Sequence, residues 1–191
     1  TPLYIAVENG EDDVVEYFLQ NGADVNVRDV NGQTPLDHCS DSVAKILLEN
    51  GADVNVRGVD GQTPLFHCRS ETKAKILLAF GAQPDAIDKS GKTPLDHLAS
   101  SALNLYAMKV GHLLAAAVGN LDIHVAAGLG MIEAVRKLIR LDTEAVTSRK
   151  HGDRALHWAV RNGQLEVVKL LVEFGAAVEA RDCRGRTALF E

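Results

Sequence analysis

The chain has 191 residues, a net charge of −6 at neutral pH, 46% hydrophobic residues and 5% aromatic residues. This composition is ordinary for a soluble globular protein, and the acidic balance disfavours a protein whose whole surface binds nucleic acid. The longest uncharged apolar run, Val110–Leu121, is too short to cross a bilayer, and three cysteines without a close pair favour a reducing intracellular location, cytoplasmic or nuclear.

The same short phrase recurs along the chain at spacings of 28 to 33 residues. The triplet Thr-Pro-Leu begins at positions 1, 34, 63 and 93, and looser versions begin at 121, 154 and 187. Because a repeat of this length cannot bury its own apolar face, the period predicts a solenoid of stacked units. We expect one domain over residues 1–191, with units at about 1–33, 34–62, 63–92, 93–120, 121–153 and 154–186 and a partial unit at 187–191.

The letters of one unit predict its local structure. In the segment Thr34–Asp37, the threonine is an N-cap, the proline occupies the first helical position, and the aspartate can accept bonds from free N–H groups. A second helix with an apolar stripe follows, as in Val43–Leu48, and an Asn-Gly pair ends it. The stretch Asp24–Gly32 then predicts a short extended piece and a polar turn, which together form a protruding finger.

These letters resemble the ankyrin repeat. The run Gly-Ala-Asp-Val-Asn, then Asp-x-x-Gly-x-Thr-Pro-Leu, with His-x-Ala in the later units, is similar to that family's signature over nearly the whole chain. The resemblance implies an all-α fold, an ankyrin-type helix-turn-helix solenoid with β-hairpin-like finger loops. It also implies a protein–protein interaction module rather than an enzyme.

Some units depart from the family pattern. Units 34–62 and 63–92 are short, and the missing residues fall between their two helices, so we expect their first helices to be curtailed. The segment Gly111–Asn120 lacks polar turn letters, which predicts a finger that is shortened or replaced by helix. An irregular joint is therefore expected near residues 100–120.

Three histidines occupy equivalent positions in successive units, which raises the question of a metal site. His38, His67 and His97 each lie on a first helix, and stacked helices are roughly 8–10 Å apart. Ligands of one zinc ion must each lie about 2 Å from the metal. The three side chains therefore form a partly exposed column, and we expect no metal and no cofactor.

The cysteines and their neighbours have structural explanations as well. Cys39 and Cys68 stand where small buried residues are expected, one unit apart and beyond the reach of a disulfide, whereas Cys183 falls on an exposed finger turn. The run Asp37-His38-Cys39 contains the letters of a catalytic triad, but consecutive helical residues do not face one another. No recognised catalytic motif occurs in the chain.

Two asparagines close the Gly-Ala-Asp-Val-Asn runs. In the family that this chain resembles, the residue at Asn26 and Asn55 orders the backbone of the finger, and in some members it is hydroxylated. The structural role is the favoured one here. Leu47 and Leu48, which precede Asn55, resemble the lead-in of a hydroxylation target.

The resemblance places partner binding on the finger tips and on the exposed face of the first helices. Residues 1–100 contain 16 acidic and 8 basic side chains, whereas residues 101–191 contain 10 and 12, so the later fingers are basic. This charge favours an acidic protein segment as the partner. The candidate binding residues are Arg28, Asp29, Asn31, Arg57, Asp60, Lys89, Lys92, Arg149, Lys150, His151, Arg161, Asn162, Arg181, Arg184 and Arg186.

Two other functions stay open. No polar capping unit is visible at either end, so the chain is expected to be a monomeric fragment of a longer protein. In that case it can be the substrate-targeting arm of a multidomain enzyme, or of a secreted bacterial effector that acts in the host cytosol. Binding of nucleic acid through the basic fingers is the weakest hypothesis. A membrane partner is not expected.

Overall fold

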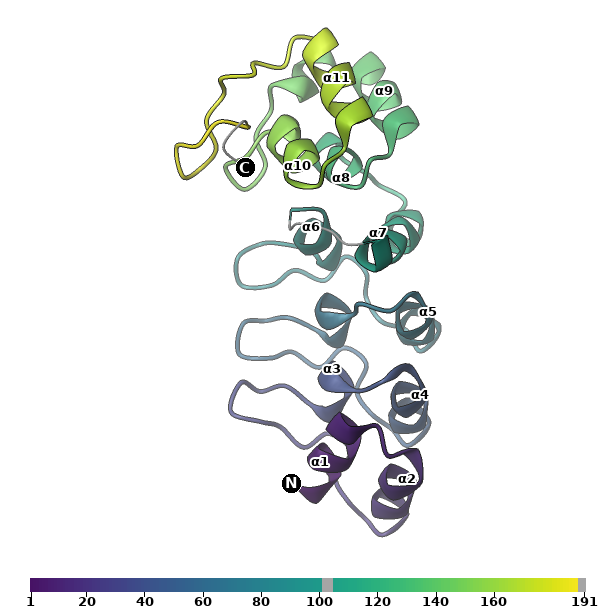
Figure 1. Ribbon diagram of the computed structural model, residues 1–191. Coiled ribbons are helices and arrows are strands. Elements are labelled where there is room, and N and C mark those ends of the chain that lie inside the picture. The colour runs from purple at the N-terminus through teal and green to yellow at the C-terminus, as the bar shows by residue number, and fades with distance from the viewer. Residues whose placement is uncertain (101–104, 189–191) are drawn as a thin grey trace. The chain divides into compact units, whose positions relative to one another are not determined.

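Short paired helices joined by loops make up the described part of the chain (Figure 1). The computed structural model describes residues 1–100 and 105–188, and it divides the chain after Pro94 into two units that are described separately here. The paired helices confirm the helical ankyrin-type fold that the sequence predicts. The assignment of all repeats to one domain stays a prediction.

The N-terminal unit contains three helix pairs and the start of a fourth. The second and third first helices have only four residues each, which confirms that they are curtailed. The elements are α1 (Pro2–Asn9), α2 (Asp12–Gln20), α3 (Pro35–His38), α4 (Asp41–Glu49), the 3-10 helix η1 (Pro64–His67), α5 (Glu71–Ala79) and α6 (Pro94–Ala99), whose first residue ends this unit.

The C-terminal unit begins with the rest of α6, continues with the longest of the described helices and ends with two regular pairs. Helix α7 (Leu105–Val118) runs through most of the segment where a finger was in doubt, so helix replaces the finger there. The expected joint lies partly outside the described residues, at 101–104. The other elements are α8 (Ile123–Gly128), α9 (Ile132–Leu141), the 3-10 helix η2 (Thr143–Val146), α10 (Ala155–Arg161) and α11 (Leu165–Glu173).

The predicted helix signals work as local chemistry requires. Thr34 and Asp37 form a capping box, in which the Thr34 N–H donates to Asp37 Oδ2 at 2.7 Å and the hydroxyl donates at 3.0 Å. Gly51 follows α4 with a φ of 87°, a left-handed value that side chains disfavour. The ends of these helices are therefore set by single residues.

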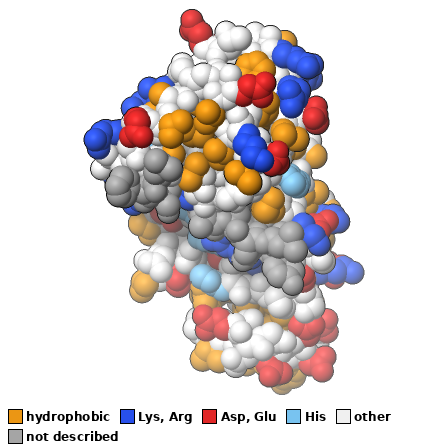
Figure 2. All heavy atoms as spheres, turned by 45° about the horizontal axis from the view of Figure 1, so that its top comes forward, with side chains coloured by type: hydrophobic (Ala, Val, Ile, Leu, Met, Phe, Trp, Pro, Cys, Tyr) orange, Lys and Arg blue, Asp and Glu red, His pale blue; other side chains and the backbone are white. Residues whose placement is uncertain are grey.

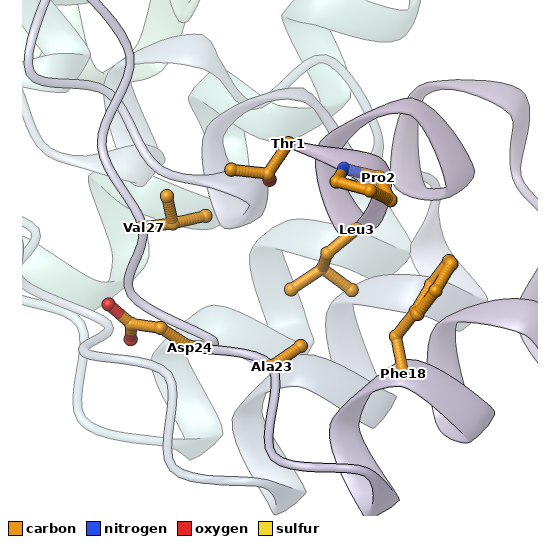
Figure 3. A pocket seen from close by; sticks show the side chains of 7 residues that line it. All are labelled: Thr1, Pro2, Leu3, Phe18, Ala23, Asp24 and Val27. Carbon is orange, nitrogen blue, oxygen red and sulfur yellow. The ribbon is translucent and has the colours of Figure 1, made fainter.

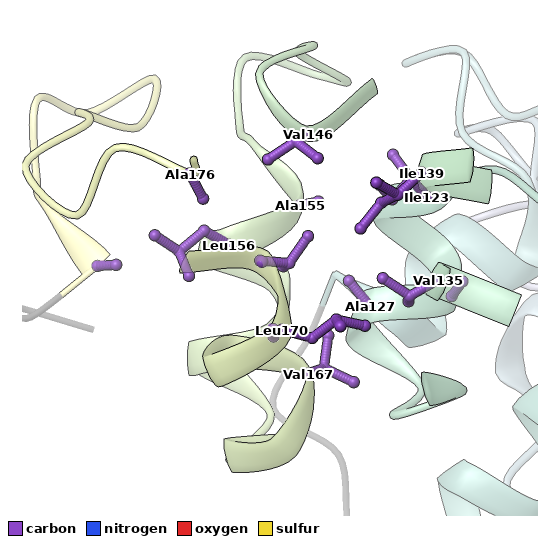
Figure 4. Packing of buried hydrophobic residues seen from close by; sticks show 14 residues of the cluster. Ile123, Ala127, Val135, Ile139, Val146, Ala155, Leu156, Val167, Leu170 and Ala176 are labelled. Atoms are coloured by element: carbon purple, nitrogen blue, oxygen red, sulfur yellow. The ribbon is translucent and has the colours of Figure 1, made fainter. Parts of the chain in front are cut away.

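Each unit has its own apolar core. In the N-terminal unit, Leu36 and Leu47 from one repeat and Leu65 and Leu77 from the next are almost completely buried. In the C-terminal unit, a cluster lies between α8 and α9 on one side and α10 and α11 on the other, with Val167 among its buried members (Figure 4). Pairs of helices thus bury the faces that single repeats cannot bury alone.

A buried lysine compensates for the shortened first helices. Lys73 lies on α5 and is only 5% exposed. Its Nζ donates to the carbonyl oxygens of Cys39 at 3.0 Å and Asp37 at 3.4 Å. These carbonyls lie where the chain leaves the curtailed α3, so without the ammonium group they would be buried and unpaired.

None of the helices in the described part of the chain combines the length and the apolar character that crossing a membrane requires.

Replacement of Lys73 by methionine is expected to lower the free energy of unfolding by about 1–3 kcal/mol, because two buried carbonyls lose their donor. Urea denaturation followed by circular dichroism measures the change. The matched control is Lys75→Met on the same helix, which removes an exposed pair with Glu71 and should change stability by about 0.5 kcal/mol or less. Equal effects of the two variants would contradict this role of Lys73.

Candidate functional site

The predicted arginines of the first two fingers bond to the main chain. Arg28 Nη1 donates to the carbonyl of Gly32 in its own finger at 3.4 Å and to that of Arg57 in the next at 2.9 Å. Arg57 repeats the arrangement with Gly61 at 3.0 Å and Ile87 at 2.7 Å. Each guanidinium therefore closes its own turn and ties it to the following finger; we call such a residue a finger-bridging arginine.

The same device recurs in the C-terminal unit. Arg149 donates to Gly152 O at 2.7 Å and to Arg181 O at 3.0 Å, and Arg181 donates to Gly185 O at 2.6 Å. The sequence predicts partner binding for these four arginines and does not reveal their bonds to the main chain. The available signal was an arginine followed by a glycine three or four residues later in each turn.

Aspartates close the finger turns. Asp29 Oδ1 accepts bonds from the N–H groups of Asn31 and Gln33, both at 2.8 Å. The Asn31 side chain also donates to Asp29 Oδ2 at 3.4 Å. Asp88 and Asp182 accept in the same way from the residues two and four positions later. Asp29 thus orders a turn, and its role as a contact for a partner stays a prediction.

Hydrogen bonds lower the pKa of two of these turn carboxyls. Burial raises the pKa of Asp182, but bonds from the N–H and the guanidinium of Arg186 outweigh it and hold the value well below its ordinary range. Burial also raises the pKa of Asp88, while bonds from Lys92 N–H and from Ser90 lower it overall. The Arg186 side chain, a predicted binding residue, is thereby engaged within its own finger.

The second finger reaches the same result with a different residue. Gly58 stands where the first finger has Asp29, so it cannot supply a carboxylate. Instead Asp60 Oδ1 accepts from the Gln62 N–H at 3.0 Å. A Cβ at Gly58 would lie 3.2 Å from Asp60 Oδ1 and 3.3 Å from Asn31 O, which is crowded. The two sequence differences between these fingers therefore compensate for each other.

Lys150 and His151 are held by acidic groups of their own unit. Lys150 Nζ forms ion pairs with Asp96 and Asp122, and it lies 6.0 Å from the centroid of the Trp158 ring. His151 Nε2 lies 3.6 Å from Asp96 Oδ2. Lys150 thus joins its finger to the starts of two first helices, because Asp96 and Asp122 lie 54 and 28 positions before it in the sequence. The Lys150 side chain is half-buried.

The pKa values of this cluster favour the charged pair. Burial raises the pKa of Asp122, but bonds from His124, Lys150 and the Val125 N–H hold it well below its ordinary value. Burial lowers the pKa of Lys150, and bonds to Asp122 and Asp96 raise it overall.

Arg161 and Asn162 connect α10 to the end of α6. Arg161 pairs with Asp153 Oδ2 at 3.2 Å and donates to Ser100 O at 2.9 Å. Asn162 Nδ2 donates to Ala99 O at 2.7 Å. Both residues therefore make contacts within the C-terminal unit, and their role in binding a partner stays a prediction.

The remaining candidate binding residues are accessible to solvent, fully or in part. Lys89, Asp60 and Arg184 are exposed, and Lys92 is half-buried. Among the described residues, no side chain bonds to the ammonium group of Lys89 or the guanidinium of Arg184. Two apolar tips, Val30 and Val59, are 95% and 61% exposed. The free finger surface is therefore smaller and more mixed in character than the sequence predicts.

The histidine column adopts the arrangement expected of surface residues. His38 is exposed and His67 is half-buried, with ring centroids 6.4 Å apart. Gln33 lies between them and bonds to both rings at 3.0 Å. Within the described ranges, no group of three potential ligands lies close enough to hold a metal ion. Cys39 and Cys68 are buried and Cys183 is exposed, as predicted.

Comparison with known proteins identifies the family. The model described as Ankyrin repeats (3 copies) matches residues 1–57, 40–114 and 123–191. The chain therefore belongs to the ankyrin repeat family. Domains of this family are generally protein-binding and typically non-catalytic, and the described part of the chain shows no catalytic domain.

The individual proteins that this chain resembles match different lengths of it. The ankyrin repeat domain of human ASB11 has a similar fold, with a TM-score of 0.70, 28% identity, and coverage of 99% of this chain and 90% of that one. The ADP-ribosylation factor GTPase-activating protein AGD2 of Arabidopsis thaliana is 49% identical over 37 residues, which is 19% of this chain and 5% of the relative. The Arf-GAP with coiled-coil, ANK repeat and PH domain-containing protein 2 of Gallus gallus is 50% identical over 40 residues, 21% of this chain and 5% of the relative. The chain thus spans about 5% of the length of these curated relatives.

Replacement of Arg57 by methionine should loosen the third finger, because the carbonyls of Gly61 and Ile87 lose a shared donor. We expect a loss of about 1 kcal/mol in stability and faster amide hydrogen exchange in residues 85–92. Mass spectrometry of exchanged peptides measures the second effect. Arg69→Met removes another exposed arginine of the same unit and is the control. Unchanged exchange in Arg57→Met would contradict the bridging role.

The Lys150 cluster predicts a defined pH dependence. Because the folded pKa of Asp122 is lowered, its stabilisation is complete above the ordinary carboxyl pKa of about 4 and is lost as pH falls below it. Because the folded pKa of Lys150 is raised, its contribution persists up to about pH 10 and is lost above. Thermal unfolding followed by fluorescence of Trp158, the sole tryptophan, measures both limits.

The control for this pH dependence is Asp122→Asn, since asparagine still caps α8 but does not titrate. The difference in melting temperature between the parent chain and this variant should be constant from about pH 5 to 7 and shrink towards pH 3. A difference that does not change with pH would show that the ion pair does not stabilise the unit.

Proposed function

We propose that this chain is a protein-binding module whose C-terminal fingers recognise an acidic segment of a partner protein. The observation that carries the proposal is the state of the arginines on these fingers. Arg181 is exposed and is held by a bond from Nη1 to Gly185 O, and the exposed Arg184 follows in the same turn.

A held guanidinium is a better anion receptor than a mobile one. Arg181 uses Nη1 for its own turn, and within the described residues its Nε and Nη2 groups have no partner. Part of the side-chain entropy is therefore lost on folding rather than on binding, which favours association. The remaining donors suit a carboxylate, which can accept two bonds from one guanidinium.

The binding test uses two fluorescent 12-residue peptides, one of alternating Glu and Ser and one of alternating Lys and Ser. The acidic peptide should bind, and its affinity should fall at least about threefold when the salt concentration rises from about 0.05 M to about 0.3 M. Fluorescence anisotropy measures both values. Binding of the basic peptide with equal affinity would contradict the proposal.

A charge-matched pair of variants locates the site. Arg184→Glu should weaken binding of the acidic peptide at least about fivefold, because it reverses the charge of a finger tip. Arg140→Glu makes the same change on the exposed end of α9 and should alter affinity by less than about twofold. Lys150 is left unchanged in both variants, since it forms internal ion pairs. Equal losses in the two variants would exclude the fingers as the binding site.

A second candidate function is that of a targeting arm in a larger enzyme. It is favoured by two matched relatives that are named as GTPase-activating proteins or Arf-GAPs and that are about twenty times longer than the matched segment. In this arrangement the fingers would select the substrate and another domain would act on it. A complete reading frame that contains only further repeats would exclude this candidate.

A further inference from the structure

The three fingers of the N-terminal unit lie side by side (Figure 1), and main-chain hydrogen bonds join their edges. The Val59 N–H donates to Asn31 O at 2.7 Å, and the Lys89 N–H donates to Asp60 O at 2.9 Å. One carbonyl near the tip of each finger therefore accepts an N–H group of the next finger. The equivalent carbonyl of the third finger is Ser90 O, which accepts no hydrogen bond from the N-terminal unit.

A glycine beside each of these carbonyls receives a side chain of the next finger. A Cβ on Gly32 would lie 3.5 Å from Val59 Cγ2, and a Cβ on Gly61 would lie 3.4 Å from Lys89 Cγ. At the equivalent Gly91, apart from its chain neighbours, no heavy atom of the N-terminal unit lies within 4 Å of that position. The outer edge of the third finger is therefore uncovered within its unit.

The third finger also lacks the side chain that bridges to a following finger. Ile87 stands at the position of the finger-bridging arginines Arg28 and Arg57, and it is 55% exposed. The fourth repeat has no finger to be bridged, because residues 119–122 alone join α7 to α8. The uncovered edge thus lies between two repeats of the chain, where the repeated sequence itself changes.

Apolar side chains hold each finger at its base. Val27 of the first finger points into the hollow beside Leu3 (Figure 3), and the equivalent Val56 and Ala86 are only 5% and 6% exposed. Bonds to the Asp88 carboxylate close the tip of the third finger. This finger is therefore ordered before a partner binds, which lowers the entropic cost of association.

Lys92 places a positive charge beside the uncovered edge. The equivalent residue of the second finger is Gln62, whose Nε2 donates to Asp88 Oδ2 of the third finger at 3.4 Å. Lys92 has an ammonium group in place of this amide, and no side chain of the N-terminal unit pairs with it. Because a charged donor binds a carboxylate more strongly than an amide does, the edge suits an aspartate.

Few other basic side chains of this unit are free to bind an aspartate. Figure 2 shows acidic side chains gathered at the end of the unit that bears the first repeat. The arginines of the first two fingers bond to carbonyls, Lys73 is buried, and Lys45 and Lys75 pair with glutamates of their own helices. The third finger holds two of the remaining basic side chains, Lys89 and Lys92.

We propose that the uncovered edge of the third finger binds a loop of a partner protein in which an aspartate precedes a branched apolar residue. The aspartate pairs with Lys92, and the next residue donates its N–H to Ser90 O and lays its side chain over Gly91. The contacts of Asp88 and Lys89 with the second finger show this arrangement within the chain.

The surroundings of Gly91 favour an apolar residue after the aspartate. Val59 already packs over Gly32 with a branched side chain, and the exposed Ile87 of the third finger offers further apolar surface. A lysine would instead bring a second ammonium group towards Lys92. The edge therefore differs from the C-terminal fingers, for which charge alone is proposed to select the partner.

The test uses the whole ¹⁵N-labelled chain and a capped heptapeptide, Ala-Ile-Asp-Val-Ser-Gly-Gln, as the probe. The peptide follows residues 86–92 with valine and glutamine in place of the two lysines. The amide signals of Gly91 and Lys92 should shift and saturate as the peptide is added. Those of Gly32 and Gly61 should stay in place, because the next finger already covers them.

Two altered peptides separate the main-chain bond from the ion pair. N-methylation of the valine removes the N–H for Ser90 O and should weaken binding at least about threefold. Asparagine in place of the aspartate should weaken binding at least about twofold. In Lys92→Gln the aspartate and asparagine peptides should bind equally, whereas the control Lys75→Gln on α5 should keep the preference for aspartate.

Three results would overturn the proposal: absence of shifts, equal affinity for the parent and N-methylated peptides, or a preference for aspartate that survives in Lys92→Gln. Shifts at residues 181–186 alone would assign the peptide to the C-terminal fingers and overturn it as well. Gly91 shifts that depend on the concentration of the chain alone, together with dimers in sedimentation, would assign the edge to a second copy and exclude a partner loop. Arg184→Glu should leave the affinity for this heptapeptide unchanged, so the two proposals fail separately.

Discussion

Side chains that bond to the main chain of the next repeat are the constraint on which the N-terminal unit depends. Its fingers have no regular strands, so their N–H and C=O groups need partners from elsewhere. Asn26 and Asn55 satisfy the loop after each second helix, and Arg28 and Arg57 satisfy the tips. Register between repeats therefore depends on a few polar contacts as well as on the apolar core.

The contacts that the sequence predicts are local ones. The capping box of Thr34 and the glycine stop at Gly51 follow from neighbouring letters, because their partners lie within a few residues. The same is true of the curtailed α3, which follows from the length of its repeat. The helix boundaries of a single repeat can thus be predicted from its own sequence, without its neighbours.

The roles of the candidate binding residues are harder to predict from the sequence, because they depend on hydrogen-bond and ion-pair partners that are distant in the chain. From the sequence, Arg28 is expected to be an exposed charge, and only the structure shows its bond to the carbonyl of Arg57. From the sequence, Lys150 is expected to be a basic finger tip, and only the structure shows its pairing with Asp96, which is 54 residues earlier. Every residue has a main-chain carbonyl, so the sequence does not show which carbonyl of another repeat accepts a bond. Residue type alone therefore cannot separate a bridging arginine from a free one.

Recurrence within the chain provides that separation. A side chain that bridges fingers must appear in successive fingers, as Arg28 and Arg57 do, because each copy needs the same carbonyl of the next repeat. A tip that is joined to another finger only through its main chain, as the Val59 N–H is to Asn31 O, has no such requirement on its side chain. The equivalent positions Val30, Val59 and Lys89 are all exposed and change from apolar to basic along the unit. Repeated letters in these fingers thus maintain the stack, and the positions that differ are the ones that our proposal assigns to distinguishing partners.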